Sequence, residues 1–386
     1  MKTVRIHRKG AGRLLAGHPW IFSSDIADRG GAEAGEAVRI AGPRGALLGT
    51  AHYSSSSQIA LRLLSREAVV PDKDFFRARI EAAEAFRRRV VSDSDAYRVV
   101  HGEADLLPAL IVDRYGEWLV IQTLDQGMDR AKPEIVAALQ EIYSPRGIVE
   151  RNEAAVRRHE NLPQIAGLLA GEEPGVVEIR MNGLRLHADL LRGQKTGVFL
   201  DQRENYVAVA RYAHGRALDC FTSTGGFALH MAARCETVEG VDSSAPALEV
   251  AESNRTANGI GNVSFREANV FGLLSGLRNA GRPYSTIVLD PPAFAKSRES
   301  LEGAARGYKE INLRALQILA PGGILVACSC SHHMSEAMLL EVVASASLDA
   351  GRTLRVLERR TQAQDHPILL TVPETHYLKC LVFEAL

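Results

Sequence analysis

The sequence predicts an α/β protein whose C-terminal half forms a mostly parallel, doubly wound sheet. From residue 193 onward, short apolar runs alternate with helical segments, and several of these runs end in polar or reactive residues. This alternation is typical of a parallel sheet that binds its ligand at the carboxyl ends of the strands. Strands are expected near 216–221, 237–242, 263–267, 285–290, 323–330, 353–358 and 376–384.

The length of 386 residues predicts further domains ahead of this sheet. Residues 1–72 read as short strands separated by glycine turns, which predicts a small β-rich module. Residues 1–70 carry ten Lys and Arg against five Asp and Glu. Such a basic module can follow a phosphate backbone, although a solvated basic face explains the charge equally well.

Residues 73–192 predict a central α/β domain, which leaves 193–386 for the doubly wound sheet. A helix is expected over 73–91 from apolar residues at helical spacing, with the run Arg87-Arg88-Arg89 on its solvated face. A second helix is expected near 130–143 and a strand near 147–151. The dipeptide Asn182-Gly183 predicts a hairpin over 176–189.

Composition and charge favour an ordinary soluble protein of the cytoplasm. The formal net charge is zero, and the five cysteines include no C-x-x-C pair, which favours a reducing compartment. No apolar stretch approaches the roughly 18 residues that a membrane-spanning helix needs. The histidines at 332, 333, 366 and 376 lack metal-ligand spacing with cysteines, so no metal site is predicted.

A glycine-containing loop, 222–227, joins the expected strand 216–221 to a helix. Asp242 ends the next strand, where an acid can bind ribose hydroxyls. The dinucleotide fingerprint G-x-G-x-x-G is absent, which disfavours a dehydrogenase. A nucleoside without a pyrophosphate, such as S-adenosylmethionine, fits these residues better. Asn269 follows the third strand and is predicted either to contact adenine or to cap a helix.

Two further strand ends carry candidate reactive residues. Asp290-Pro291-Pro292 ends one strand, and the prolines stiffen this turn. Cys328 and Cys330 lie two residues apart on the next strand and therefore face the same side. Cys330 is nearer the carboxyl end and is the candidate nucleophile, whereas Cys328 is expected to be a buried, inert thiol. The segment 193–197 lacks the spacing of a phosphate-binding loop, so Lys195 is expected to touch cofactor or RNA instead.

Together these motifs resemble the RlmI-type 23S ribosomal RNA cytosine-5 methyltransferases over essentially the whole chain. The segments that carry the resemblance are Gly17-His18-Pro19-Trp20-Ile21-Phe22, Gly193-Gln194-Lys195-Thr196-Gly197, Leu200-Asp201-Gln202-Arg203, Cys220-Phe221, Thr224-Gly225-Gly226-Phe227, Asp290-Pro291-Pro292 and Ser329-Cys330-Ser331. Many cytosine-5 RNA methyltransferases carry a second cysteine next to the Asp-Pro motif, whereas the corresponding stretch here is Pro291-Pro292-Ala293, as in the RlmI type. Asn269 stands where relatives often have Asp.

The resemblance implies an N-terminal PUA domain, a central α/β domain with a β-hairpin, and a Rossmann-like class I methyltransferase domain. It implies S-adenosylmethionine as cofactor, 23S ribosomal RNA as partner, and Cys330 with Asp290 as catalytic residues. A homodimer is kept open. The residues expected at the cofactor are Gln202, Asp219, Phe221, Gly225, Gly226, Phe227, Asp242, Ser243, Asn269 and Asp290.

The implied reaction is covalent catalysis at cytosine. The Cys330 thiolate adds to carbon 6, which makes carbon 5 nucleophilic toward the methyl donor. Lys195 and Lys296 are the cations expected to favour the thiolate. Residues 296–309 are expected to form a mobile flap over the pocket, with Lys296, Arg298, Arg306, Tyr308 and Lys309 among them.

Two alternatives stay open at this point. An N-methyltransferase acting on guanine or adenine in RNA would use Asp290-Pro291-Pro292 and would not need Cys330. A non-catalytic RNA-binding factor that keeps the cofactor fold would need neither. The methylated nucleoside separates the first from cytosine methylation, and S-adenosylmethionine binding tests the second.

Overall fold

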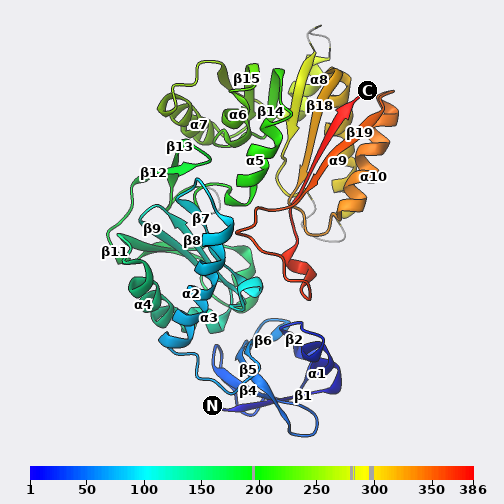
Figure 1. The fold of residues 1–386 in the computed structure, drawn as a ribbon. Coiled ribbons are helices and arrows are strands. Elements are labelled where there is room, and N and C mark those ends of the chain that lie inside the picture. Colours follow the sequence, from blue (N-terminus) through cyan, green and yellow to red (C-terminus); the bar gives the residue numbers. More distant parts are fainter. Residues whose placement is uncertain (194–195, 279–280, 282, 295–299) are drawn as a thin grey trace. The chain divides into compact units, whose positions relative to one another are not determined.

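The computed structural model describes residues 1–193, 196–278, 281, 283–294 and 300–386. The chain forms two compact units, each described below by itself (Figure 1). Unit 1 comprises Met1–Arg180, Ala188–Val198 and Gln364–Thr375, and unit 2 comprises Met181–His187, Phe199–Ala363 and His376–Leu386. The predicted cationic residues Lys195, Lys296 and Arg298 lie outside the described residues. The division into three domains stays a prediction.

Unit 1 begins with a six-stranded sheet in the order β2-β6-β5-β4-β1-β3, which agrees with the predicted β-rich module. Helix α1 packs on this sheet, and Leu14 of the helix shares one core with Val4, Ile40 and Leu61 of the strands. The bounds are β1 (Thr3–Ile6), α1 (Arg8–Leu15), β2 (Trp20–Phe22), β3 (Ile26–Asp28), β4 (Ala37–Ala41), β5 (Leu47–Tyr53) and β6 (Ile59–Ser65).

A second sheet of unit 1 has five strands in the order β11-β10-β9-β8-β7. Helices α2 and α4 cover it, and their apolar faces enter one core through Phe76, Ile80 and Leu139. Asp72 starts α2 by accepting a hydrogen bond from the Phe75 amide at 3.0 Å, as an N-cap does. The bounds are α2 (Lys73–Val90), β7 (Ala96–His101), β8 (Leu110–Tyr115), β9 (Trp118–Thr123), α3 (Gln126–Arg130), α4 (Lys132–Tyr143), β10 (Gly147–Asn152) and β11 (Ile165–Gly171).

The prediction of a solvated face at 87–89 is wrong for Arg87, which is 0% exposed. Its Nη2 donates to Asp105 Oδ2 at 2.7 Å and to the Asp365 carbonyl at 2.8 Å, and its Nε donates to the Arg98 carbonyl at 2.8 Å. Hydrogen bonds and an opposite charge offset the cost of burying the guanidinium. Sequence periodicity could not reveal these partners, which come from distant segments.

The predicted hairpin is present as β12 (Val176–Met181) and β13 (Leu184–Asp189). Its turn residues Asn182 and Gly183 both have positive φ, 52° and 80°, as this tight turn requires. The Asn182 amide donates to the Arg203 carbonyl at 2.8 Å. This contact fixes the tip of the hairpin against the first helix of unit 2.

Unit 2 is a seven-stranded sheet in the order β16-β15-β14-β17-β18-β20-β19. The strands from β16 to β18 pair in parallel, and β20 is antiparallel to both of its neighbours. This confirms the predicted mostly parallel sheet. The strands are β14 (Gly215–Cys220), β15 (Cys235–Asp242), β16 (Val263–Glu267), β17 (Tyr284–Leu289), β18 (Leu319–Ser329), β19 (Leu354–Arg360) and β20 (Lys379–Ala385).

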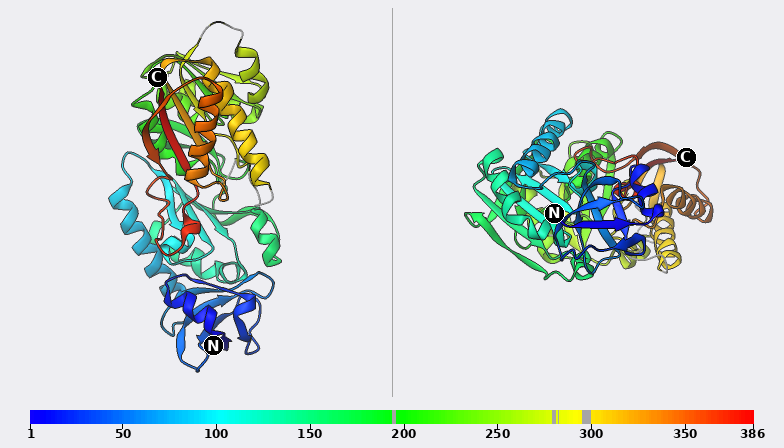
Figure 2. Two further views of the ribbon diagram at one scale, coloured as in Figure 1. Left: turned by 90° about the vertical axis from the view of Figure 1, so that its right-hand side faces the viewer. Right: turned by 90° about the horizontal axis from the view of Figure 1, so that it is seen from below.

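Helices cover both faces of this sheet, as double winding requires (Figure 1). One face carries α5 (Arg203–Ala210), α6 (Gly226–Met231) and α7 (Ala245–Ala257), and the other carries α8 (Val270–Leu277), α9 (Leu301–Ile318) and α10 (Glu336–Asp349). Helices α9 and α10 lie side by side and share a core with the central strands (Figure 2). Strands buried on both faces explain the continuous apolar runs in the sequence.

The expected flap over 296–309 is wrong for its described part. Residues from Leu301 onward belong to α9, and Tyr308 is buried in the core of unit 2. Lys309 pairs with Asp349 of α10 at 2.7 Å, and Arg306 is exposed and reaches Glu302 one turn earlier. The charged residues in this stretch had suggested a surface loop, but they line the outer face of an amphipathic helix.

Among the described residues, no helix combines the length and the apolar character needed to cross a membrane.

Candidate active site

The parallel register brings the predicted site residues to one edge of the sheet. Cys220, the last residue of β14, pairs with Val241 on one side and with Leu289 on the other. Leu289 in turn pairs with Ala327 of β18. Asp242 and Asp290 directly follow Val241 and Leu289, and Cys330 follows Ala327 by three residues, just after β18 ends. All three therefore lie at the carboxyl ends of neighbouring parallel strands.

The loop after β14 has an unusual backbone. Phe221 and Ser223 have positive φ, 65° and 49°, and Gly225 follows with a φ of 89°. Such conformations are costly for residues with a side chain and often occur at binding sites. A Cβ on Gly226 would lie 2.4 Å from the Tyr206 ring, so this glycine allows α6 to pack against α5. The Phe227 ring also packs on Tyr206, edge to face, and is buried.

Asp242 is held at the end of β15 by two backbone donors. Its Oδ2 accepts from the Ser223 amide at 2.9 Å, and its Oδ1 accepts from the Ser244 amide at 3.0 Å. The carboxylate is thereby fixed against the loop after β14, with Ser243 exposed beside it. An anchored acid at this position suits ribose hydroxyls.

Asp219, near the end of β14, is fully buried. Its Oδ2 accepts from Thr222 Oγ1 at 2.5 Å and from the Ala228 amide at 2.9 Å. Its Oδ1 has no hydrogen-bond partner among the described residues. Burial raises the pKa of Asp219 to about 7, although both hydrogen bonds oppose the change. The second oxygen is thus a buried acceptor for which the described residues supply no donor.

Asn269 is the N-cap of α8, which is one of the two roles predicted for it. Its Oδ1 accepts from the Gly272 amide at 3.2 Å. The side-chain oxygen is therefore committed to the helix, and the amide nitrogen is the part that remains for adenine. The cap also fixes the direction of this side chain at the end of β16.

Asp290 is oriented by a relay of amides. Gln202, in the short helix Leu200–Gln202, donates from Nε2 to Asp290 Oδ2 at 2.9 Å. Gln202 Oε1 accepts from Asn205 Nδ2 at 2.7 Å, and Asn205 Oδ1 accepts from Arg360 Nε at 2.9 Å. Because Arg360 can only donate, it fixes the amide of Asn205, which in turn fixes the amide of Gln202. Gln202, expected at the cofactor, thus contacts Asp290.

The two cysteines of β18 differ as the strand position predicts. Cys328 is 1% exposed, and burial together with its neighbour Cys380 raises the pKa of its thiol well above the ordinary value. Cys330 lies just beyond the strand and is partly exposed. None of the five cysteines, all of which lie in the described part of the chain, forms a disulfide. Cys330 is thus the more accessible thiol of the two.

Two residues around Cys330 were missed by sequence reasoning. The Tyr308 hydroxyl lies 2.9 Å from Ser329 Oγ and 3.2 Å from Ser331 Oγ, the serines on either side of Cys330. Lys379 Nζ donates to the Ser331 carbonyl at 2.8 Å. Pairing the last predicted strand with the one that ends at Cys330 would have found Lys379. No sequence signal marks Tyr308, which had been placed in the expected flap.

Comparison with known proteins agrees with this arrangement. Residues 98–384 match the S-adenosylmethionine-dependent methyltransferase family, and residues 4–66 match a PUA-like domain. The chain belongs to the S-adenosylmethionine-dependent methyltransferase family. This confirms the resemblance, the fold class and the cofactor predicted from the sequence.

Individual relatives align over nearly their whole length. The ribosomal RNA large subunit methyltransferase I of Tolumonas auensis is 42% identical, with 100% of this chain and 99% of the relative aligned. The protein of the same name from Shewanella amazonensis is 41% identical over 95% of this chain and 94% of its own. A solved structure from Streptococcus mutans, described as a SAM-dependent methyltransferase, has the same fold, with a TM-score of 0.85, 20% identity and full coverage of both chains.

The strand-end residues of this methyltransferase fit S-adenosylmethionine. Asp219 keeps a buried oxygen without a partner in the described chain, which suits a ligand donor. Asp242 is anchored by two backbone donors, and Asn269 caps α8 through its side-chain oxygen. The candidate ligand-binding groups are carboxylate oxygens and an amide, and they lie near the strained loop after β14. Such a combination suits a nucleoside.

Proposed function

We propose that this protein methylates carbon 5 of a cytosine in ribosomal RNA of the large subunit, in 23S RNA, through a covalent adduct with Cys330. One observation carries the proposal: a partly exposed cysteine follows β18 and an aspartate follows the neighbouring parallel strand β17, at the same sheet edge as the loop after β14. The relatives' name, ribosomal RNA large subunit methyltransferase I, supports the class of substrate.

Cys330 is the proposed nucleophile. Its thiolate forms a bond from Sγ to carbon 6 of cytosine, and the electron pair of the carbon 5–carbon 6 double bond shifts onto carbon 5 and the atoms conjugated with it. Carbon 5 thereby becomes nucleophilic. S-adenosylmethionine, when bound, supplies the methyl group that carbon 5 accepts. Loss of the carbon-5 proton to a base, for which Asp290 and water are the candidates, then expels the thiolate and restores the aromatic ring.

Asp290 is the proposed partner of the cytosine edge. Gln202 donates to its Oδ2, and this bond orients the carboxylate before substrate arrives. The cytosine amino group or the protonated N3 can then donate to the carboxylate and stabilise the adduct. A preoriented acceptor of this kind needs no rearrangement during the reaction, which favours the transition state.

The cofactor residues of the proposal are those at the strand ends of unit 2. Asp219 and Asp242 supply carboxylate acceptors, and Asn269 supplies an amide. The other proposed members lie in the segments that follow β14, β15 and β17, in the first turn of α6, or, for Gln202, in the short helix Leu200–Gln202. They are Gln202, Phe221, Gly225, Gly226, Phe227, Ser243 and Asp290.

The N-terminal PUA-like module is proposed to grip the RNA backbone. Seven of its basic side chains are exposed, whereas Arg62 is buried in ion pairs with Asp125 and Glu160. The exposed ones are Arg5, Arg8, Lys9, Arg29, Arg39, Arg44 and Arg66. Binding through phosphates makes the affinity fall with added salt.

We further propose a cytoplasmic location, where ribosomes are assembled. The homodimer stays a prediction that light scattering on the purified protein tests.

Radiolabelled methyl transfer to unmodified large-subunit ribosomal RNA tests the proposal. Nuclease digestion followed by nucleoside mass spectrometry should identify 5-methylcytidine. N-methylated guanine or adenine as the product would replace the proposal by the alternative that uses Asp290-Pro291-Pro292. Absence of S-adenosylmethionine binding in calorimetry would instead indicate a non-catalytic RNA-binding factor.

A further inference from the structure

Lys379 lies at the corner of the chain that holds Cys330. It is the first residue of β20, and its Cα pairs with that of Ser329 in the antiparallel ladder between β18 and β20. Its side chain is 3% exposed. The Nζ atom donates to the Ser331 carbonyl and to the Tyr377 carbonyl, both at 2.8 Å. The ammonium group is therefore fixed beside the backbone of Ser329-Cys330-Ser331.

The charge of Lys379 is not neutralised by these hydrogen bonds, because both acceptors are neutral carbonyls. Burial lowers the pKa of Lys379 to about 8, while the charges of Cys330 and Glu336 raise it. Glu336, at the start of α10, is also paired with Arg359 of β19. Cys330 is thus one of the two acidic groups that act on this ammonium, and the other already has a cationic partner.

Other titratable groups near this corner stay neutral or have partners of their own. Burial raises the pKa of the Tyr308 hydroxyl on α9. Burial also raises the pKa of Cys328 on β18, which contacts Cys380 of β20. On β19, Arg360 is bonded to Asn205 and Glu358. These contacts leave the Cys330 thiol as the partly exposed acidic group next to the backbone that Lys379 holds.

We infer that Lys379 holds the Cys330 thiol in its thiolate form by fixing an ammonium charge beside the sulfur. A neighbouring cation favours the thiolate over the thiol, and burial of the ammonium group strengthens the attraction. The thiol proton goes to solvent, and Lys379 keeps its own protons. The pairing of Lys379 with Cys330 requires neither RNA nor S-adenosylmethionine. The inference rests on the proposed function only in that the thiolate then acts as the nucleophile.

The pH dependence of Cys330 alkylation measures this directly. The protein, without RNA or S-adenosylmethionine, is treated with iodoacetamide across pH 5 to 10. Peptide fragmentation in the mass spectrometer separates Cys330 from Cys328. The wild-type midpoint should lie below about 8.5, the value of an ordinary thiol. A wild-type midpoint at or above that value overturns the inference without any variant.

Substitutions then assign the effect to the lysine. Lys379→Met should raise the midpoint by about one pH unit, so that alkylation at pH 7 slows about tenfold. Lys379→Arg should restore a midpoint near wild type because it keeps the charge. Lys309→Met, which removes a lysine paired with Asp349 on the surface of α9, serves as the matched control and should change nothing. An unchanged midpoint in Lys379→Met contradicts the inference.

Methyl transfer by the same variants separates this inference from the proposed function. Lys379→Met should lose about tenfold of its rate at pH 7 and recover as the pH rises toward 9, a profile that a purely structural defect would not produce. If Cys330→Ala retains methyl transfer, the proposed function fails even where the alkylation result stands. If Cys330→Ala is inactive but Lys379→Met alkylates like wild type, the inference fails and the function stands.

Discussion

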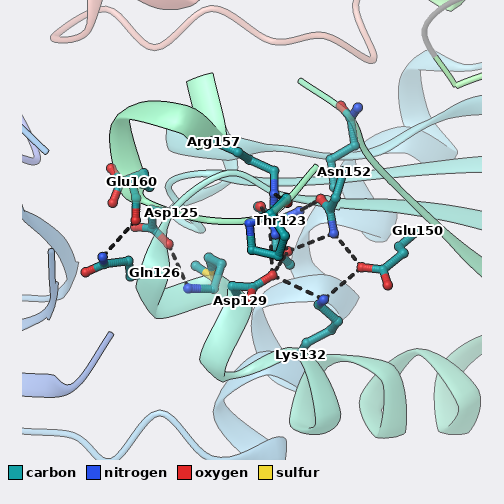
Figure 3. Close-up of polar contacts among 12 residues, drawn as sticks. Thr123, Asp125, Gln126, Asp129, Lys132, Glu150, Asn152, Arg157 and Glu160 are labelled. Atoms are coloured by element: carbon teal, nitrogen blue, oxygen red, sulfur yellow. Dashed lines mark hydrogen bonds and ion pairs between the residues drawn. The ribbon is translucent and has the colours of Figure 1, made fainter. Parts of the chain in front are cut away.

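Unit 1 and unit 2 each bury a cluster of charged side chains, and the two clusters treat their charges differently. The Arg157 cluster of unit 1 consists of Thr123, Asp129, Lys132, Glu150, Asn152 and Arg157 (Figure 3). The strand-end cluster of unit 2 consists of Asp219, Asp290, Cys330 and Lys379. The first matches each charge with an opposite one, whereas burial shifts the pKa values of Asp219 and Lys379 in the second toward neutral pH.

Pairing is close in the Arg157 cluster. Arg157 Nη1 lies 2.9 Å from Asp129 Oδ1, and Lys132 Nζ lies 3.1 Å from the same oxygen and 2.7 Å from Glu150 Oε2. Burial opposes ionisation of Asp129, but hydrogen bonds from Arg157, Thr123 and Lys132 outweigh it and lower the pKa of this carboxyl. Asp129 therefore stays ionised at neutral pH, and its ion pairs serve the fold.

The strand-end cluster behaves in the opposite way. Burial raises the pKa of Asp219 to about 7 and lowers that of Lys379 to about 8. Both groups therefore titrate close to neutral pH. The comparison teaches that a buried ionisable group indicates function where burial brings its pKa close to neutral, and indicates structure where ion pairs keep it charged.

The largest effect is expected from breaking the Arg157 cluster. Arg157→Met leaves Asp129 with fewer cationic partners in the interior and should lower the free energy of unfolding by about 3–5 kcal/mol. Urea denaturation followed by circular dichroism measures this. Arg158→Met, the exposed neighbour, is the matched control and should stay within about 0.5 kcal/mol of wild type. Equal stability of the two variants would contradict a structural role for the cluster.

Asp219 should make cofactor affinity depend on pH. With a pKa of about 7, the carboxyl is mostly protonated at pH 6 and mostly ionised at pH 8, so affinity for S-adenosylmethionine should rise about tenfold between them. Calorimetry measures the dissociation constant. Asp219→Asn should give a flat profile, whereas Asp349→Asn on the surface should follow wild type.

Stability should change with pH in the opposite direction. Because the folded pKa of Asp219 lies above its ordinary value, this group favours the folded state at low pH, and that contribution is lost as the pH rises through about 7. In the affinity experiment of the preceding paragraph, a rise of affinity with pH that persists in Asp219→Asn would show that another group causes the pH dependence.

A smaller loss is expected from releasing Asp290. Gln202→Leu removes the donor at 2.9 Å and should lower kcat about tenfold, which corresponds to about 1.4 kcal/mol, with little change in the KM for RNA. Gln164→Leu, whose amide bonds Arg158 on the surface of unit 1, is the control. A change confined to KM would mean that Gln202 acts in binding and not in orienting the carboxylate.

The smallest effect is expected at Tyr308. Tyr308→Phe removes the hydroxyl that lies between Ser329 and Ser331, a loss of about 1 kcal/mol. Steady-state kinetics should show a rate reduced about fivefold. Tyr212→Phe, whose hydroxyl bonds Glu358, should keep the wild-type rate. Identical rates in the two variants would remove Tyr308 from the support of Cys330.

The sequence predicted the sheet and its strand ends because local patterns determine them. Asp242, Asp290 and Cys330 each follow an apolar run, and parallel pairing then places them on one edge. Lys379 was not predicted, because its position depends on β20 pairing antiparallel with β18 across about 50 residues of chain. Arg87 was assigned to solvent for the same reason, since its partner Asp105 and the Asp365 carbonyl are distant in sequence.

Trapping the adduct tests the central claim most directly. In a large-subunit ribosomal RNA transcript made with 5-fluorocytidine, fluorine replaces the carbon-5 proton, so the ring cannot regain aromaticity and the bond to Sγ persists. With S-adenosylmethionine present, wild type and Cys328→Ala should give a protein–RNA complex that survives a denaturing gel, and Cys330→Ala should give none. A complex of equal yield with Cys330→Ala, or none with a wild-type protein that forms 5-methylcytidine on ordinary RNA, would contradict the account.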